Sequence, residues 1–235
     1  MSRNMLALGT TLIAVVLASA TQAVWSDNFD GYGPGSINGQ GGWQGWDNVA
    51  VNAGVVTPQI FASPPHSQEI GGLADSVHQF SGYNSGVCVF RTLMYIPTDF
   101  SGKQFFILLN TYKDLGPYDW SLQIKFDSAT GLVTDDFNAG PSLPYITGNW
   151  IPLVNVIDLN NDVRTTYYGG NLLSSGSWKR DTGVLNIAAI DLYANYGETS
   201  ASPVYYDEMY LTPEPGTIAT LVCGLSGLLL LRRRR

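Results

Sequence analysis

The sequence predicts an all-β protein, an antiparallel two-sheet sandwich of jelly-roll type. Aromatic residues make up 12% of the chain and charged residues only 13%, a composition typical of strands with wet apolar faces. Short runs alternate between apolar and polar side chains, and turn-forming residues separate them. Residues 24–212 show no apolar pattern of helical period. A helical bundle is therefore excluded.

The N-terminal segment has the layout of a secretory signal peptide. Arg3 precedes the apolar run 6–18, and small residues follow as far as Ala23. We expect a signal helix in residues 1–23 that is recognised by the Sec translocon and removed after Ala23, although Ala20 also fits the cleavage pattern. An uncleaved anchor is the alternative, but the apolar run is shorter than the roughly 20 residues that span hydrocarbon.

Residues 24–212 form the predicted body. Strands are expected at 87–96, 104–112, 120–126, 150–159, 163–168, 187–194 and 204–211. The alternation in 120–126 predicts a half-buried strand with Trp120 on the same apolar face as Leu122 and Phe126. About ten to thirteen strands with no linker-like break predict a single sandwich domain.

The C-terminal segment, residues 213–235, predicts a membrane anchor. Pro213-Glu214-Pro215 precedes the uncharged run 216–231, and Arg232, Arg233, Arg234 and Arg235 end the chain. A helix of that run is about 24 Å long, and arginine side chains can reach the membrane surface. Four arginines hold the C-terminus in the cytoplasm, so the body faces outward. The alternative, a buried core helix, would show an amphipathic stripe, and this run has none.

The order of these C-terminal elements resembles the PEP-CTERM sorting signal of Gram-negative bacteria that make exopolysaccharide. The resemblance covers about the last 23 residues. It implies an inner-membrane anchor that a membrane-embedded exosortase recognises and cleaves near Pro213-Glu214-Pro215, which releases the body to the outer surface or matrix. A plain linker before a membrane anchor is the alternative interpretation.

A second resemblance covers the body. Ser26-Asp27-Asn28-Phe29-Asp30-Gly31-Tyr32, then Gly39-Gln40-Gly41-Gly42-Trp43, the hairpin 163–170 and the closing Tyr205-Tyr206-Asp207-Glu208-Met209 are similar to the concanavalin A-like lectin/glucanase (laminin G-like) superfamily. In that superfamily the first and last strands lie side by side.

Charge and acid spacing limit the chemistry of the body. Residues 24–212 contain 7 Lys and Arg against 18 Asp and Glu, a net charge of −11 that makes nucleic acid a poor partner. Glycoside hydrolysis needs two carboxyl groups about 5–9 Å apart. The adjacent Asp207 and Glu208 point to opposite faces of a strand. We therefore expect no catalytic residue, no enzyme activity and no cofactor, although carboxylates from different strands can still converge.

Carbohydrate binding is the positive candidate for the body. Trp43 and Trp46 lie in a polar, glycine-rich stretch in which Gln44 and Asp47 supply hydrogen-bonding groups. Sugar rings stack their C–H faces on exposed indoles. Core packing is the alternative role for both tryptophans. A second candidate cluster is formed by Tyr112, Tyr118 and Trp120.

A structural calcium ion is the one metal that the sequence suggests. Asp27, Asp30 and Asp207 approach each other if the first and last strands pair, and calcium prefers six to eight oxygen ligands. Solvated acids at strand ends are the alternative.

The sequence thus predicts an exported surface or extracellular-matrix protein that associates with exopolysaccharide. A purely structural biofilm protein without glycan binding and a divergent glycoside hydrolase are the alternatives. Exosortase, the Sec translocon and exopolysaccharide are the expected partners, with the membrane as a partner before processing.

Overall fold

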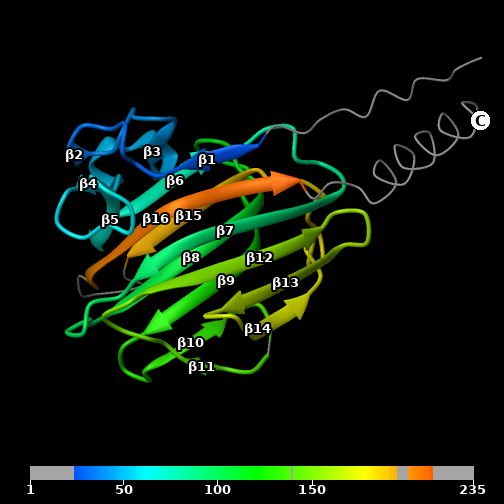
Figure 1. Ribbon diagram of the computed structural model, residues 1–235. Coiled ribbons are helices and arrows are strands. Elements are labelled where there is room, and N and C mark those ends of the chain that lie inside the picture. The colour runs from blue at the N-terminus through cyan, green and yellow to red at the C-terminus, as the bar shows by residue number, and fades with distance from the viewer. Residues whose placement is uncertain (1–23, 139, 195–200, 214–235) are drawn as a thin grey trace, which may run out of the picture.

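The computed structural model describes residues 24–138, 140–194 and 201–213, and these form two antiparallel sheets that lie face to face (Figure 1). Sheet A has the order β14 (Asn171–Gly176), β13 (Val163–Tyr168), β12 (Trp150–Asp158), β7 (Val87–Tyr95), β16 (Ala201–Pro213), β5 (Ser67–Gly72), β4 (Val55–Thr57) and β2 (Gly35–Ser36), and β1 (Trp25–Asp27) also pairs with β16. Sheet B has the order β11 (Leu143–Pro144), β10 (Leu132–Asp135), β9 (Asp119–Asp127), β8 (Lys103–Thr111), β15 (Ala189–Ala194), β6 (Asp75–Gln79) and β3 (Trp43–Gly45).

The all-β, two-sheet architecture is confirmed. Each of the seven expected strands is present, with ends that differ by up to three residues. The described residues contain 16 strands, more than expected, because several are only two or three residues long. Helical structure in the described ranges consists of two 3₁₀ turns, η1 (Trp46–Asn48) and η2 (Ala50–Asn52).

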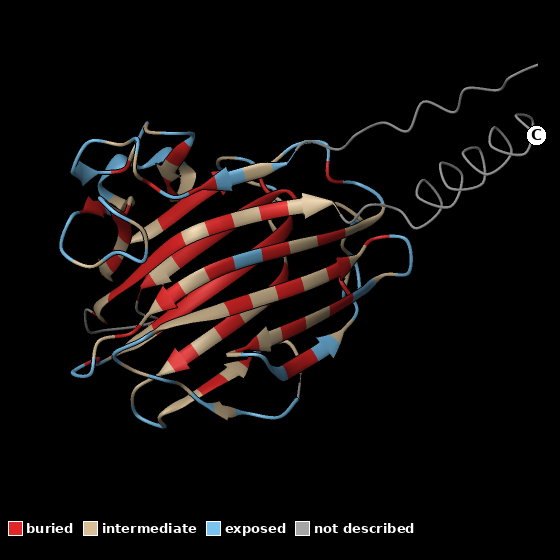
Figure 2. Ribbon diagram, in the orientation of Figure 1, coloured by how far each residue is buried: buried red, intermediate tan, exposed pale blue. Residues whose placement is uncertain are grey.

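The core fills the space between the sheets. In β8 the alternate residues Phe106 and Leu108 enter it, and in β9 Leu122 and Ile124 do the same. Figure 2 shows this alternation as bands of buried and half-buried residues along the strands of sheet A. Cys88 in β7 is also fully buried and packs as a small hydrophobic residue.

A β-bulge changes the face of one predicted core residue. Leu108 pairs with Leu122, but the next residue, Leu109, pairs with Trp120, so β9 has one extra residue, Ser121, at this point. The extra residue reverses the alternation. The prediction that Trp120 shares a face with Leu122 is therefore wrong, because Trp120 lies on the outer face of sheet B, away from the core.

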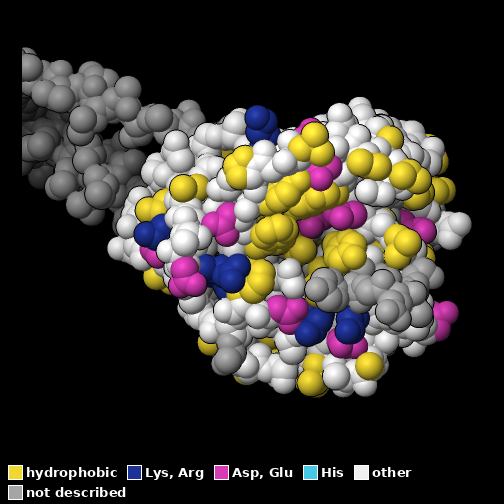
Figure 3. Space-filling view, turned by 180° about the vertical axis from the view of Figure 1, so that it is seen from behind, with side chains coloured by type: hydrophobic (Ala, Val, Ile, Leu, Met, Phe, Trp, Pro, Cys, Tyr) yellow, Lys and Arg dark blue, Asp and Glu magenta, His cyan; other side chains and the backbone are white. Residues whose placement is uncertain are grey.

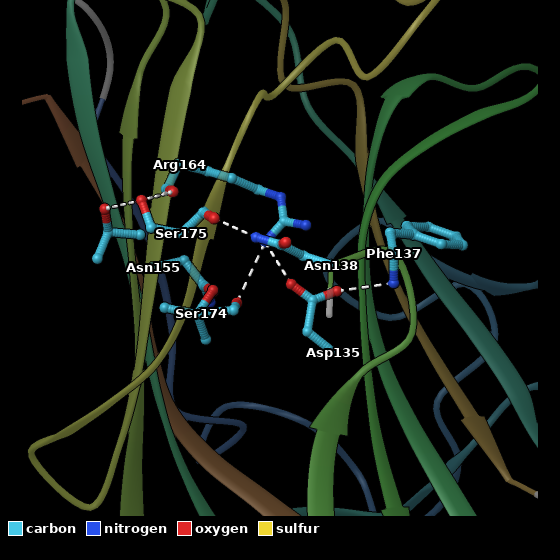
Figure 4. A network of polar contacts seen from close by, with 9 residues as sticks. Asp135, Phe137, Asn138, Asn155, Arg164, Ser174 and Ser175 are labelled. Atoms are coloured by element: carbon cyan, nitrogen blue, oxygen red, sulfur yellow. Dashed lines mark hydrogen bonds and ion pairs between the residues drawn. The ribbon is translucent and has the colours of Figure 1, made fainter. Parts of the chain in front are cut away.

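A buried ion pair links the two sheets. Arg164 in β13 donates from Nη1 to Oδ2 of Asp135, at the end of β10, over 2.6 Å (Figure 4). Ser174 in β14 accepts a longer bond of 3.4 Å from the same nitrogen. The side chains of Arg164 and Asp135 are only 2% and 1% exposed. A charge at this depth is stable only with its partner in place.

The predicted signal helix and most of the predicted sorting segment lie outside the described residues. The last strand, β16, ends at Pro213, which pairs with Cys88. None of the helices in the described ranges has the length and apolar content that a membrane crossing requires.

Candidate functional site

The candidate site is a groove on the outer face of sheet B. The residues of β8 that do not enter the core, Phe105, Ile107 and Leu109, form a separate apolar cluster on this face. A cavity of about 180 Å³ lies over it, with a lining from η1, β6, β8, β9 and β15. Figure 3 looks onto this side and shows a band of hydrophobic side chains with acidic side chains set within it.

An aromatic wall borders the groove. Trp46 in η1 and Trp120 in β9 lie nearly parallel, with ring centroids 5.9 Å apart and an interplanar angle of 14°. Tyr112 and Tyr118 pack against Trp46, with centroids 4.9 and 4.8 Å away. The structure therefore unites Trp46 with the second cluster that the sequence suggested. The bulge in β9 makes this possible, since it turns Trp120 outward.

Hydrogen bonds hold the wall in place. Asp47 accepts from the Tyr118 hydroxyl at 2.6 Å and from the Leu115 backbone N–H at 2.8 Å, through the same oxygen. The backbone N–H of Asp47 donates to the Tyr112 hydroxyl. Gln44 donates to Asp114 at 2.6 Å. Gln44 and Asp47 thus position the aromatic residues around Trp46.

Two aspartates lie at the floor of the cavity. Asp75 in β6 and Asp191 in β15 are on neighbouring strands and line the same cavity. Burial raises the pKa of Asp75 to about 6, and the hydrogen bond from Asp191 offsets part of that effect. Burial and the charge of Asp75 raise the pKa of Asp191 well above its ordinary value. At neutral pH the two carboxyl groups therefore retain a proton as a pair.

The raised pKa of Asp191 predicts a pH-dependent effect on stability. Between pH about 4, where an unfolded aspartate ionises, and neutral pH, the folded chain holds a proton that the unfolded chain has released. The unfolded state binds fewer protons, so the stability contributed by this carboxyl falls as pH rises. Asp191→Asn removes that proton uptake. We expect the variant to gain stability relative to the parent between pH 4 and pH 7, as measured by urea unfolding.

Asp158→Asn is the control of opposite sign. Hydrogen bonds from the Asn161 side chain and from the backbone of Asn160 and Asn161 lower the pKa of the half-buried Asp158. Its contribution to stability is present above pH about 4 and is lost on acidification. A pH-independent difference between Asp191→Asn and the parent would contradict the assignment of the proton.

The groove continues past Phe105 and Gln123 into an adjoining hollow lined by Lys103, Lys125 and Asp136. Both lysines already have acidic partners. Lys125 lies 2.9 Å from Asp136, and Lys103 lies 3.9 Å from Asp127. These contacts place an acidic side chain beside each lysine of the hollow.

The two tryptophans of the predicted glycan site have different positions. Trp46 lines the groove, whereas Trp43 in β3 is 1% exposed and belongs to the core. Trp43 packs against Phe29 and His78, and its Nε1 donates to Asp27. Trp43 is thus a core-packing residue, whereas Trp46 remains a candidate for sugar contact.

The candidate calcium ligands lie near one seam but have other partners. As expected, the first and last strands pair, with Asp27 opposite Met209. Asp27 accepts from Trp43 Nε1 and the Tyr32 hydroxyl. Asp30 accepts from Asn28, and Asp207 accepts from the backbone of residues 62 and 63. Within the described ranges, no group of three or more His, Cys, Asp or Glu side chains has the geometry of a metal site. The calcium ion stays a prediction.

Sequence reasoning did not select the residues at the floor of the groove. Asp75 and Asp191 are far apart in the chain, and only the pairing of β6 with β15 brings them together. The one available signal was a lone acid within the otherwise apolar run 187–194. A buried strand accepts such an acid only where it has a partner or a function.

Comparisons with known proteins support the fold. No model of a known protein family matches the chain, and no curated protein sequence matches it. A sialidase structure is similar over 83% of this chain at 9% identity (TM-score 0.56), although the match spans only 19% of the sialidase. The endo-β-1,4-glucuronan lyase of the fungus Trichoderma reesei (TM-score 0.52, 12% identity) and the alginate lyase Aly36B (0.53, 12%) are similar over 80% and 83% of this chain and 94% and 98% of their own. At these identities the similarity shows the fold alone, a sandwich of two antiparallel sheets.

Proposed function

We propose that this protein is an exported glycan-binding module whose outer sheet B groove holds a polysaccharide chain. The observation that carries the proposal is the stacked pair Trp46–Trp120 directly beside the Asp75–Asp191 pair in one cavity. Indole rings offer flat apolar surface to the C–H face of a sugar, and carboxyl oxygens accept bonds from its hydroxyl groups. The groove supplies both.

The fold adds support of a general kind. The two lyases with this fold are named for glucuronan and alginate, both polysaccharides. A jelly roll supports many functions, so this is support by analogy. The groove residues carry the argument for this chain.

Replacing Trp46 with alanine tests the proposal. We expect loss of about 2 kcal/mol of binding free energy, roughly 30-fold in affinity, because the variant removes one side of the stacking surface. The measurement is affinity electrophoresis or calorimetry against a panel of exopolysaccharides, including that of the native host. A purely structural matrix protein would bind none of them.

Trp150→Ala is the matched control. Trp150 is a half-buried tryptophan in β12 that packs against Tyr95 and belongs to sheet A, the opposite layer. Its loss removes a similar amount of aromatic surface but leaves the groove intact. Equal loss of binding in both variants would contradict the groove as the binding site.

We also propose that the groove binds without cleaving. Asp75 and Asp191 each affect the pKa of the other, and we infer that their carboxyl groups lie closer together than the roughly 5–9 Å that glycoside hydrolysis needs. They therefore act as a pair and do not flank a glycosidic bond. Release of reducing ends or of unsaturated sugars, abolished by Asp75→Asn, would favour the divergent glycosidase or a lyase instead.

Export and sorting complete the proposal. The signal peptide directs the chain through the Sec translocon, and an exosortase processes it near Pro213-Glu214-Pro215. In the described residues β16 extends to Pro213, the first residue of the motif. Mass spectrometry of the protein from the host surface is expected to find a start after Ala23 and an end near Pro213. An intact chain with Arg232 to Arg235 would contradict this.

A further inference from the structure

Arg180 is a cation held in place beside the aromatic wall of the groove. It lies in the loop that follows β14 and is exposed. Its Nη1 donates over 3.2 Å to the backbone carbonyl of Trp120, and its Cζ lies 3.8 Å from the ring centroid of Phe137. A guanidinium that both stacks on a ring and bonds to the backbone has a fixed orientation, so its other N–H groups are presented in one direction.

The loop that carries Arg180 is itself fixed. Arg180 has a left-handed backbone with φ of 59°, a conformation that is uncommon in residues other than glycine. Its backbone N–H donates to Ser177 Oγ over 3.0 Å, and Ser177 Oγ donates to Asp162 over 2.9 Å. Backbone strain of this kind is concentrated at functional sites.

The guanidinium of Arg180 has no acidic partner. Arg164 lines the same hollow of about 290 Å³, but Asp135 is its partner. Asp181 also lines this hollow and Asp119 precedes Trp120 in the chain, yet among the described residues Arg180 belongs to none of the ion pairs. An arginine without such a partner binds a carboxylate through two parallel N–H···O bonds.

The paired acids at the floor of the groove lie on the other side of Trp120. The strands of sheet B run in the order β10, β9, β8, β15, β6, and Arg180 stacks on the residue two positions after β10. Asp191 in β15 and Asp75 in β6 are two and three strands from β9, roughly 10 and 14 Å at the usual strand spacing. The Debye length in physiological salt is about 8 Å, so these acids oppose an anion beside Arg180 only weakly.

We propose that Arg180 forms an anion subsite at the β10 side of the groove, where it binds the carboxylate of an acidic sugar unit next to the unit that stacks on Trp46 and Trp120. The inference rests on the proposed function, since it names a ligand class for the same groove. Trp120 joins the two parts, because its side chain lines the groove and its carbonyl holds the guanidinium. Neighbouring units of one polysaccharide chain therefore reach both.

Paired probes test this inference. The probes are hexasaccharides of glucose, galactose and mannose, each compared with the same hexasaccharide after oxidation of its C6 hydroxyls to carboxylates. The host exopolysaccharide is tested in the same way, before and after chemical reduction of its carboxylates. Calorimetry with the purified protein at neutral pH and physiological salt is expected to show about tenfold tighter binding of the carboxylate form in at least one pair.

Arginine variants assign the preference to one side chain. Arg180→Gln removes the charge, and we expect the preference to fall to about twofold or less while the neutral form binds as it does to the parent. Arg180→Lys keeps the charge without the planar fork and is expected to give an intermediate preference. Arg91→Gln is the matched control, since Arg91 is an exposed arginine in β7 of the opposite sheet. It changes the net charge equally and is expected to keep the preference of the parent.

The outcomes distinguish the subsite from the proposed function. Equal or weaker binding of the carboxylate form in every pair that binds, a preference that survives in Arg180→Gln, or an equal loss in Arg91→Gln overturns the subsite and leaves glycan binding intact. Tight binding of the carboxylate form that Trp46→Ala does not weaken separates Arg180 from the groove and also overturns it. Failure to bind any probe or the host exopolysaccharide overturns glycan binding, and the subsite with it.

Discussion

Replacing Arg164 with methionine is expected to lower the free energy of unfolding by about 3–5 kcal/mol, because the variant leaves the Asp135 carboxylate buried without its cation. Asp135 has a side chain only 1% exposed. Its Oδ1 accepts from the Phe137 backbone N–H at 3.0 Å, and its Oδ2 accepts from Arg164. One backbone donor does not replace a guanidinium at this depth.

Two further variants give this prediction its controls. Lys125→Met breaks the Lys125–Asp136 pair, whose side chains are 27% and 24% exposed, and is expected to cost about 0–1 kcal/mol. Arg164→Met/Asp135→Leu removes both buried charges and is expected to recover most of the loss. Urea unfolding curves measure all three. A cost for Arg164→Met no larger than that for Lys125→Met would show that the chain hydrates or neutralises Asp135 by another route.

The central strands were predictable because each carries its own pattern. Residues 163–168 form the strand β13 with the predicted bounds, and 150–159 and 87–96 each differ from β12 and β7 by one residue at one end. All three strands are rich in β-branched and aromatic residues, and β7 and β12 have nine residues each. Strands such as β5 contain glycine and polar residues, and β2 has only two residues. Their pairing partners define them, and a single sequence does not show those partners.

The site was only partly predictable because two non-local features build it. The first is the bulge at Ser121, which turns Trp120 out of an alternation that looks regular in the sequence. The second is the pairing of β6 with β15, which joins Asp75 to Asp191. Trp46 was predictable as a candidate because an aromatic residue in a polar, glycine-rich loop is often exposed. Its stacking partner was not, since η1 and β9 meet only in the folded chain.

The same reasoning separates Trp43 from Trp46, which lie three positions apart in the sequence. Trp43 sits in β3, an edge strand of sheet B, and its ring contacts Phe29, His78 and Trp25. Its Nε1 donates over 2.9 Å to Oδ2 of Asp27. Asp27 is itself 8% exposed and also accepts from the Tyr32 hydroxyl and the Phe29 backbone N–H. Trp43 therefore closes this end of the core and keeps a buried carboxylate bonded.

Trp43→Ala is expected to lower the free energy of unfolding by about 3–5 kcal/mol through the cavity it leaves. Trp43→Phe fills much of that cavity but lacks the N–H, so its smaller loss of about 1–3 kcal/mol reports the bond to Asp27. Trp46→Ala opens no cavity in the core between the sheets, and we expect it to reduce glycan affinity with a much smaller change in stability. Urea unfolding and calorimetry on the same samples measure both effects.

If Trp43→Ala unfolded no more readily than Trp46→Ala, Trp43 would not close the core. If Trp43→Phe weakened glycan binding as strongly as Trp46→Ala does, the ligand would contact the edge of β3, and the groove between η1 and β9 would have to be extended to include it.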